Sequence, residues 1–163
     1  MLAFHAIYSV LIQEMLRFKG KQLRPLQEHS AADSQTGAVG DVEVVDSAGE
    51  VFEALEIKHG IEITAKVLND VKRKLMDRKV DRYYVLTTHA NCRSDSLTDV
   101  LTQIQSRLGC QVIVNGVLPS LGYYLRLLAD PSSFFPAYAA LLKIDKAIAY
   151  EHREAWNKIA TGS

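Results

Sequence analysis

The sequence predicts an α/β protein in which a mixed β-sheet, containing one antiparallel hairpin, is flanked by helices. Two β-rich segments joined by a short turn come early in the chain, and a strand–helix–strand–helix–strand succession follows from the second of them. Such a succession is typical of layered α/β domains. The chain has 163 residues, of which 48% are hydrophobic and 23% charged. This composition supports a core in a single domain spanning residues 1–163.

The N-terminal segment, residues 2–18, has the apolar spacing of a helix with a wide buried face. Gly20 is expected to end this helix. Because His5, Glu14 and Arg17 interrupt the apolar residues, the segment is interpreted as a buried amphipathic helix, not as an export signal or a membrane span. Residues 22–38 are polar and predict a long loop, with room for a short strand near its end.

Residues 41–46 and 51–58 are β-rich and flank a turn that contains Gly49, which predicts a β-hairpin. A turn centred on Ala48 and Gly49 fixes which residues lie opposite one another. The predicted opposed pairs are Val45 with Phe52, Glu43 with Ala54, and Asp41 with Glu56.

The remaining elements follow from apolar periodicity and from residues typical of helix ends. They are a helix beginning at Thr64 and running to Met76, a strand over 83–88, a helix capped by Ser94 or Asp95 and ending near Leu108, a strand over 110–114, a helix from Pro119 towards Leu128, and a long helix from Pro136 to about Ile159.

The charge balance excludes a molecule that binds polyanions through its overall field. Nineteen basic residues offset nineteen acidic ones, so any site for nucleic acid must be a local patch. The two cysteines, Cys92 and Cys110, have no metal-ligand spacing. We expect them to be reduced thiols of a cytoplasmic protein.

The hairpin register brings acidic side chains together on one face of the sheet. Opposed residues have Cβ atoms about 4.5–5.5 Å apart, and opposed carboxylates repel each other. Asp41 and Glu56 form such a pair, and Lys58 shares their face. A divalent cation would remove the repulsion, and Mg²⁺ prefers one or two carboxylates with water and phosphate oxygens. The alternative interpretation is that these residues are solvated charges on an exposed hairpin.

Together, Gly40-Asp41, the short hairpin and Ala54-Leu55-Glu56-Ile57-Lys58 resemble the motif of the PD-(D/E)xK nuclease superfamily. The flanking order, with a helix before the motif and a helix and strand after it, is similar to the common core of that superfamily over residues 1–118. Gly40 stands where the family has proline. The segments 56–60 and 82–88 look most like those of a type II restriction endonuclease.

The resemblance implies a restriction-endonuclease-like fold and Mg²⁺-dependent hydrolysis of phosphodiester bonds in double-stranded DNA, with Mn²⁺ able to substitute. It assigns Asp41 and Glu56 as metal ligands and Lys58 as the catalytic lysine that assists the attacking water. An enzyme that cuts a short symmetric site is expected to be a homodimer, because protein symmetry then matches the palindrome. The apolar segment 134–142 is a candidate for the dimer interface.

Further residues are candidates for supporting roles. Glu43 lies on the face of Asp41 and is the better auxiliary acid; Glu14 is the only acid of the first helix and is equally well a surface residue. Four basic residues of the helix after the hairpin are candidates for contacts with DNA phosphates. For each of these residues, a position on a solvated helix face is the simpler interpretation. These candidates are Lys66, Lys72, Arg73 and Lys74. The loop 27–36 is a candidate groove-facing element.

Two other functions remain open from the sequence. The chain is short for a restriction enzyme, so it could be a truncated or inactive relative that binds DNA or a protein partner. It could also be a repair or recombination nuclease that recognises DNA structure, which duplex and branched substrates would distinguish.

Overall fold

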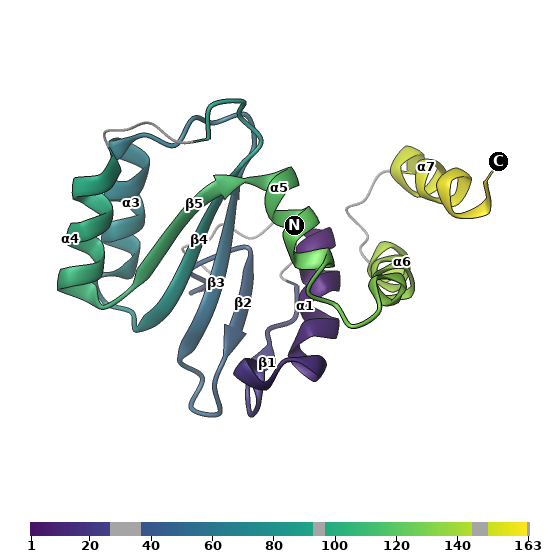
Figure 1. Ribbon diagram of the computed structural model, residues 1–163, viewed down its shortest axis with the longest axis horizontal. Helices are drawn as coiled ribbons and strands as arrows, with labels where there is room; N and C mark the ends of the chain where they lie inside the picture. Colours follow the sequence, from purple (N-terminus) through teal and green to yellow (C-terminus); the bar gives the residue numbers. More distant parts are fainter. Residues whose placement is uncertain (27–36, 93–96, 145–149, 163) are drawn as a thin grey trace.

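A five-stranded sheet with strand order β1-β2-β3-β4-β5 lies at the centre of the molecule (Figure 1). The computed structural model describes residues 1–26, 37–92, 97–144 and 150–162. The strands are β1 (Gln22–Leu23), β2 (Val42–Val45), β3 (Val51–Lys58), β4 (Val80–Thr87) and β5 (Gln111–Gly116). The helices are α1 (Leu2–Glu14), α3 (Ala65–Leu75), α4 (Thr98–Leu108), α5 (Val117–Leu125), α6 (Phe134–Ile144) and α7 (Tyr150–Thr161), with short 3₁₀ turns at Leu16–Phe18 and Pro131–Ser133.

The sheet is mixed, as the sequence predicts. β1 pairs with β2 and β2 with β3 in antiparallel fashion, whereas β3, β4 and β5 are parallel. The two parallel connections pass through α3 and α4, which supply the crossovers that parallel strands require. The predicted α/β class is therefore confirmed.

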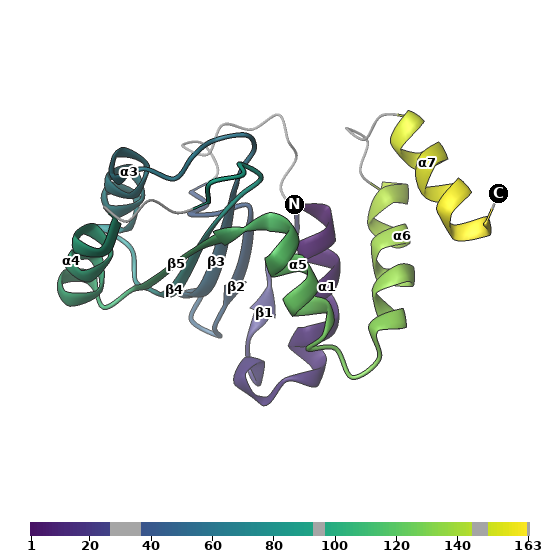
Figure 2. The same ribbon diagram turned by 45° about the horizontal axis from the view of Figure 1, so that its top comes forward.

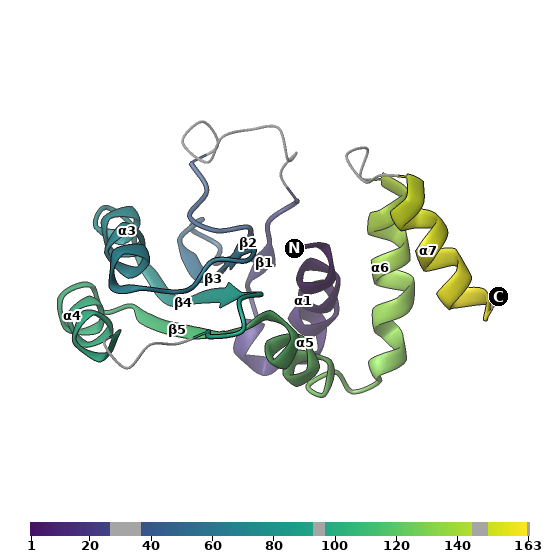
Figure 3. The same ribbon diagram turned by 90° about the horizontal axis from the view of Figure 1, so that it is seen from above.

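Helices cover both faces of the sheet (Figures 2 and 3). Helices α3 and α4 bury one face through a core that includes Leu68, Leu75 and Ile104. Helices α1 and α5 bury the other, with Ile7 and Tyr124 in its core. Burial of apolar area on two faces is the main stabilising contribution in such a fold.

The hairpin is consequently buried on both sides. The exposed fractions are 3% for Glu43, 0% for Glu53 and 7% for Glu56. Acids this deeply buried need partners, because an unpaired buried charge is strongly destabilising. For Glu56, the interpretation as a solvated charge on an exposed hairpin is therefore wrong, whereas Asp41 and Lys58 are partly buried.

Glu53 shows how one of these acids is accommodated on the α1 side of the sheet. Its carboxylate accepts a hydrogen bond from the Tyr8 hydroxyl of α1 and pairs with Arg17, and Arg82 lies 3.8 Å from it. Burial raises the pKa of Glu53, although the Tyr8 hydrogen bond and the arginine charges act in the opposite direction. The network links α1 to the middle of the sheet.

The hairpin register is confirmed in part. Glu43 lies opposite Ala54 as predicted, but Val45 pairs with Val51 and not with Phe52, because the register shifts between Val44 and Val45. The extra residue of this bulge is Phe52, whose ring contacts Phe18 edge-on at a centroid distance of 6.1 Å.

Several element boundaries also differ from the predictions. The first helix ends at Glu14 because Met15 adopts an extended backbone, and Leu16 is 87% exposed. In the segment 22–38 the structure describes a short strand, β1, at the start, while residues 27–36 lie outside the described part of the chain; β4 begins at Val80. The predicted helix 136–159 is represented by two helices, α6 and α7.

The remaining predictions concern the helix caps, the loop 27–36, the two cysteines and membrane spans. Thr64 occupies the N-cap position of α3, but its side chain makes no capping hydrogen bond. The capping candidates Ser94 and Asp95 and the loop 27–36 are not among the described residues. Cys92 and Cys110 are both free thiols. Among the described residues, no helix has the length and apolar character needed to cross a membrane.

Candidate active site

The segment before β2 places Asp41 against the middle of β3. The Asp41 amide donates a hydrogen bond to the Leu55 carbonyl at 2.7 Å, which continues the hairpin pairing beyond Val42. The Asp41 carboxylate in turn accepts a hydrogen bond from the Ile57 amide at 2.7 Å. Asp41 is therefore fixed beside the residue that separates Glu56 from Lys58.

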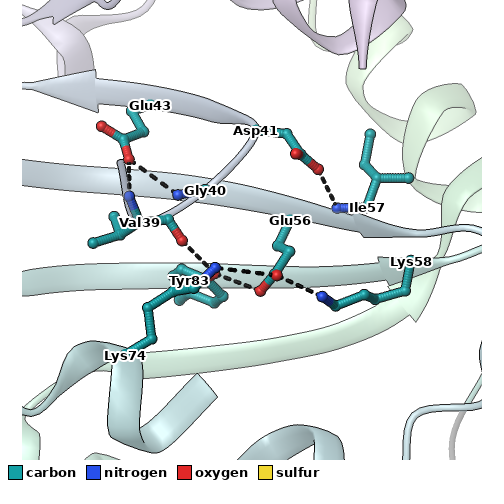
Figure 4. A network of polar contacts seen from close by, with 9 residues as sticks. All are labelled: Val39, Gly40, Asp41, Glu43, Glu56, Ile57, Lys58, Lys74 and Tyr83. Carbon is teal, nitrogen blue, oxygen red and sulfur yellow. Dashed lines mark hydrogen bonds and ion pairs between the residues drawn. The ribbon is translucent and has the colours of Figure 1, made fainter. Parts of the chain in front are cut away.

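Glu56 contacts three side chains from three elements (Figure 4). Its Oε1 lies 2.6 Å from the Lys58 ammonium and 3.2 Å from the Lys74 ammonium. Its Oε2 lies 2.6 Å from the Tyr83 hydroxyl. Burial acts to raise the pKa of Glu56, but the hydrogen bonds from Lys58 and Tyr83 and the lysine charges outweigh it and lower the pKa. The side chain is thus a carboxylate near neutral pH.

The structure brings Asp41, Glu56 and Lys58 to one end of the hairpin, on the face covered by α3. In Figure 4 the Asp41 side chain points towards β3, whereas the Glu56 carboxylate is turned away from Asp41, towards Tyr83 and the two lysines. Lys58 remains 31% exposed, so its ammonium is accessible from solvent.

Two contributors to this site were not predicted. Tyr83 is fully buried in the core, and its hydroxyl lies 2.6 Å from both Glu56 and the Val39 carbonyl. The parallel pairing of Ala54 with Tyr83 places the tyrosine on the Glu56 face. The available signal was that a buried tyrosine hydroxyl normally has a polar partner. Lys74, predicted to contact DNA, instead contacts Glu56.

Glu43 does not lie free beside Asp41 as a spare ligand. One carboxylate oxygen accepts hydrogen bonds from the amides of Val39 and Gly40, and the other lies 2.5 Å from the Arg24 guanidinium. Its observed contacts therefore fix the chain that leads into Asp41. A small hollow next to Asp41 is lined in part by Arg24 and Glu43.

Glu14 lies away from these residues. Asp41 lies near the start of α1. Burial lowers the pKa of the Met1 amine there, and the charge of Asp41 acts in the opposite direction. Glu14 is the last residue of α1, roughly 20 Å along a helix that rises about 1.5 Å per residue. Its carboxylate accepts a hydrogen bond from the Ala129 amide at 3.0 Å. The structure therefore does not bring Glu14 to the Asp41 site.

The basic residues of α3 do not form one surface. Lys66 and Arg73 are exposed, and Arg73 pairs with Asp70 of the same helix. Lys72 donates to the Gln103 side chain of α4 at 3.2 Å. Lys74 faces the sheet. Of the four predicted phosphate contacts, Lys66 and Arg73 are thus the solvent-facing ones.

A divalent cation at this site would have at most two carboxylate ligands from the described residues. No group of three or more His, Cys, Asp or Glu side chains suited to a metal ion occurs within the described residues. Mg²⁺, however, often takes only one or two carboxylates and completes its shell with water and phosphate oxygens. Asp41 and Glu56 provide two carboxylates on one face, and Glu56 would have to exchange one of its present partners for the cation.

Comparison with known proteins adds no family assignment. No protein-family model matches the chain, and no curated protein matches it. The resemblance to the PD-(D/E)xK motif therefore stays an expectation from the sequence.

Proposed function

We propose that this protein is a divalent-metal-dependent endonuclease with a PD-(D/E)xK-type site that hydrolyses phosphodiester bonds in double-stranded DNA. One observation supports this most directly: the Lys58 ammonium lies 2.6 Å from the Glu56 carboxylate, while the Asp41 carboxylate binds the amide of the intervening Ile57. A mixed sheet with helices on both faces is compatible with the restriction-endonuclease-like fold that the motif implies.

In this proposal, Asp41 and Glu56 hold the cation. When bound, Mg²⁺ or Mn²⁺ would polarise a phosphoryl oxygen and lower the pKa of water. Lys58 orients the attacking water and offsets the negative charge that develops on the phosphate. In the hydrolysis, the water oxygen forms a new bond to phosphorus and one ester P–O bond breaks. The proton lost by the water is taken up by the leaving alkoxide.

The proposal includes a restriction-type substrate and a homodimer. A two-fold dimer would present one site to each strand of a palindrome. A repair or recombination nuclease would instead favour branched over linear duplexes, so parallel assays on both substrates separate these activities.

An inactive DNA-binding or interaction protein is the second candidate. The observation that favours it is that both Glu56 oxygens already contact side chains, Lys58 and Lys74 on one and Tyr83 on the other. Such a protein would retain the fold and the charges but would not cleave.

The test is incubation of supercoiled plasmid with the protein and Mg²⁺, with Asp41→Asn and Lys58→Met as variants. Asp41→Asn keeps an acceptor for the Ile57 amide while removing the charge. Each variant is expected to reduce cleavage by roughly 10²–10⁴-fold, the usual contribution of such groups. Glu50→Ala, at an exposed residue of the hairpin turn, is the matched control and should cleave like the wild type. Equal cleavage by all four proteins would identify a contaminant and contradict the proposal.

A further inference from the structure

Helix α3 supplies a second ammonium group to the carboxylate of Glu56. Lys74 lies in the last turn of α3, between the buried residues Val71 and Leu75, and its side chain is only 27% exposed. Its Nζ lies 3.2 Å from Glu56 Oε1. Figure 4 shows the Lys74 side chain rising from α3 towards Glu56 and Tyr83. The helix thus directs this lysine into the site and not towards solvent.

The charges around Glu56 determine how a divalent cation would interact with the site. Two ammonium groups share the single oxygen Oε1, at 2.6 Å and 3.2 Å, and two positive charges this close repel each other. Asp41 and Glu56 together carry two negative charges, which the two lysines balance. A divalent cation added to this arrangement would meet repulsion from both lysines, and such repulsion is strong in a poorly solvated site.

The orientation of the Glu56 carboxylate also indicates that Lys74 and a divalent cation would compete for it. This carboxylate is turned away from Asp41 in Figure 4. Tyr83 contacts it from β4, the neighbour of β3 on the side away from β2, and Lys74 contacts it from α3. These contacts favour an orientation in which the two carboxylates do not converge. Releasing Lys74 would remove one of the forces that keep them apart.

We propose that Lys74 is a positioning residue that competes with the divalent cation for Glu56, holding the carboxylate when the metal is absent and releasing it when the metal binds. This inference rests on the proposed function, because it takes Glu56 to be a metal ligand. The ammonium group released from Glu56 would then pair with a phosphate oxygen of DNA. Metal and DNA binding are therefore expected to strengthen each other, since each separates Lys74 from Glu56.

The experiment measures Mn²⁺ affinity by electron paramagnetic resonance and calorimetry, without cleavage as a readout. Lys74→Met and Lys74→Gln should bind Mn²⁺ about tenfold more tightly than the wild type, because one competing positive charge is lost. Lys74→Arg retains the charge and should restore weaker binding. Lys158→Met, at an exposed lysine of α7 that pairs with Glu154, should match the wild type. Glu56→Gln should abolish the binding, which locates the metal.

The outcomes separate this inference from the proposed function. Mn²⁺ binding that requires Glu56 but is equal in the wild type, Lys74→Met and Lys74→Gln would overturn the role of Lys74 and leave the nuclease proposal intact. Binding by the two neutral variants but not by the wild type would support competition in its strongest form. Absence of binding in every variant, each shown to be folded by circular dichroism, would overturn both.

Discussion

At Gly40 an added side chain would press against β3. A Cβ atom built there would lie 2.6 Å from the Leu55 carbonyl oxygen and 3.2 Å from the Ala54 Cβ. The Gly40 amide also donates to Glu43 at 3.0 Å, and proline has no amide hydrogen to donate. Glycine at this position therefore has a local cause, the close approach of this segment to β3.

Gly40→Ala is consequently expected to lower the free energy of unfolding by about 1–3 kcal/mol, the usual cost of overpacking a tight site. It should also weaken Mn²⁺ binding, because Asp41 follows directly. Urea denaturation and Mn²⁺ titration measure the two effects. Gly122→Ala in α5 is the matched control, since a Cβ atom there meets nothing within 4 Å. Equal stability of Gly40→Ala and the wild type would contradict this account.

The hydroxyl group of Tyr83 makes its own contribution to stability, beside that of the buried ring. Tyr83→Phe would leave the Val39 carbonyl and one Glu56 oxygen without this donor, in a site where the side chain is fully buried. We expect a loss of about 1–3 kcal/mol in unfolding free energy, as for other unsatisfied buried polar groups. Tyr123→Phe, at a residue that is 60% exposed, should cost far less in the same urea experiment.

At the scale of elements, the hairpin and the alternation of strands and helices could be predicted because turn residues and apolar periodicity are local properties. The pairing of Glu43 with Ala54 followed from the turn. The bulge that releases Phe52 from the ladder could not be predicted, because its ring packs on Phe18 from another part of the chain.

The candidate site was predictable only in the part that lies along the hairpin. Asp41, Glu56 and Lys58 are close in sequence, and strand alternation places them on one face. Tyr83 and Lys74 reach Glu56 from β4 and α3, so their contribution depends on how the parallel crossover packs. A two-residue strand such as β1 also exists only through its pairing with β2, which local propensity does not encode.

Helix α1 is linked to the chain after β1 by His5, and this link predicts a pH dependence of stability. The His5 Nε2 lies 3.0 Å from the Arg24 carbonyl. Burial lowers the pKa of His5 below its ordinary value of 6.5, although the hydrogen bond to the carbonyl acts in the opposite direction. The unfolded chain therefore takes up this proton at a higher pH than the folded chain does. The contribution of His5 to the free energy of unfolding is fully present above about pH 6.5 and is lost as the pH falls through the folded-state pKa of His5.

The measurement is the free energy of unfolding in urea between pH 7.5 and pH 5. His5→Gln should flatten the part of the curve due to this histidine, because glutamine does not titrate. His152→Gln, at an exposed residue of α7, should keep the wild-type slope. An unchanged slope in His5→Gln would show that other groups cause the pH dependence.

At the scale of the whole molecule, α7 is the element least tied to the sheet. Figures 1 and 3 show α6 beside α1 and α7 beyond α6, remote from the strands. No residue of α7, described throughout as 150–161, is buried. The ring of Trp156 packs against Phe135 at 6.0 Å and Tyr138 at 4.8 Å between centroids. These aromatic contacts with α6 bury little apolar area compared with the two cores of the sheet.

Trp156 therefore reports on the docking of α7 separately from the unfolding of the sheet, since it is the only tryptophan of the chain. In increasing urea, its emission should shift to the red before the far-ultraviolet circular dichroism signal is lost, because segments with few buried contacts open at lower free energy. Phe135→Ala should move the fluorescence transition to still lower urea and leave the main circular dichroism transition nearly unchanged. If the two signals coincide in the wild type and shift together in Phe135→Ala, α7 unfolds as part of one cooperative unit with the sheet. The helical pair α6–α7 would then act as part of the core domain and not as a separately opening appendage.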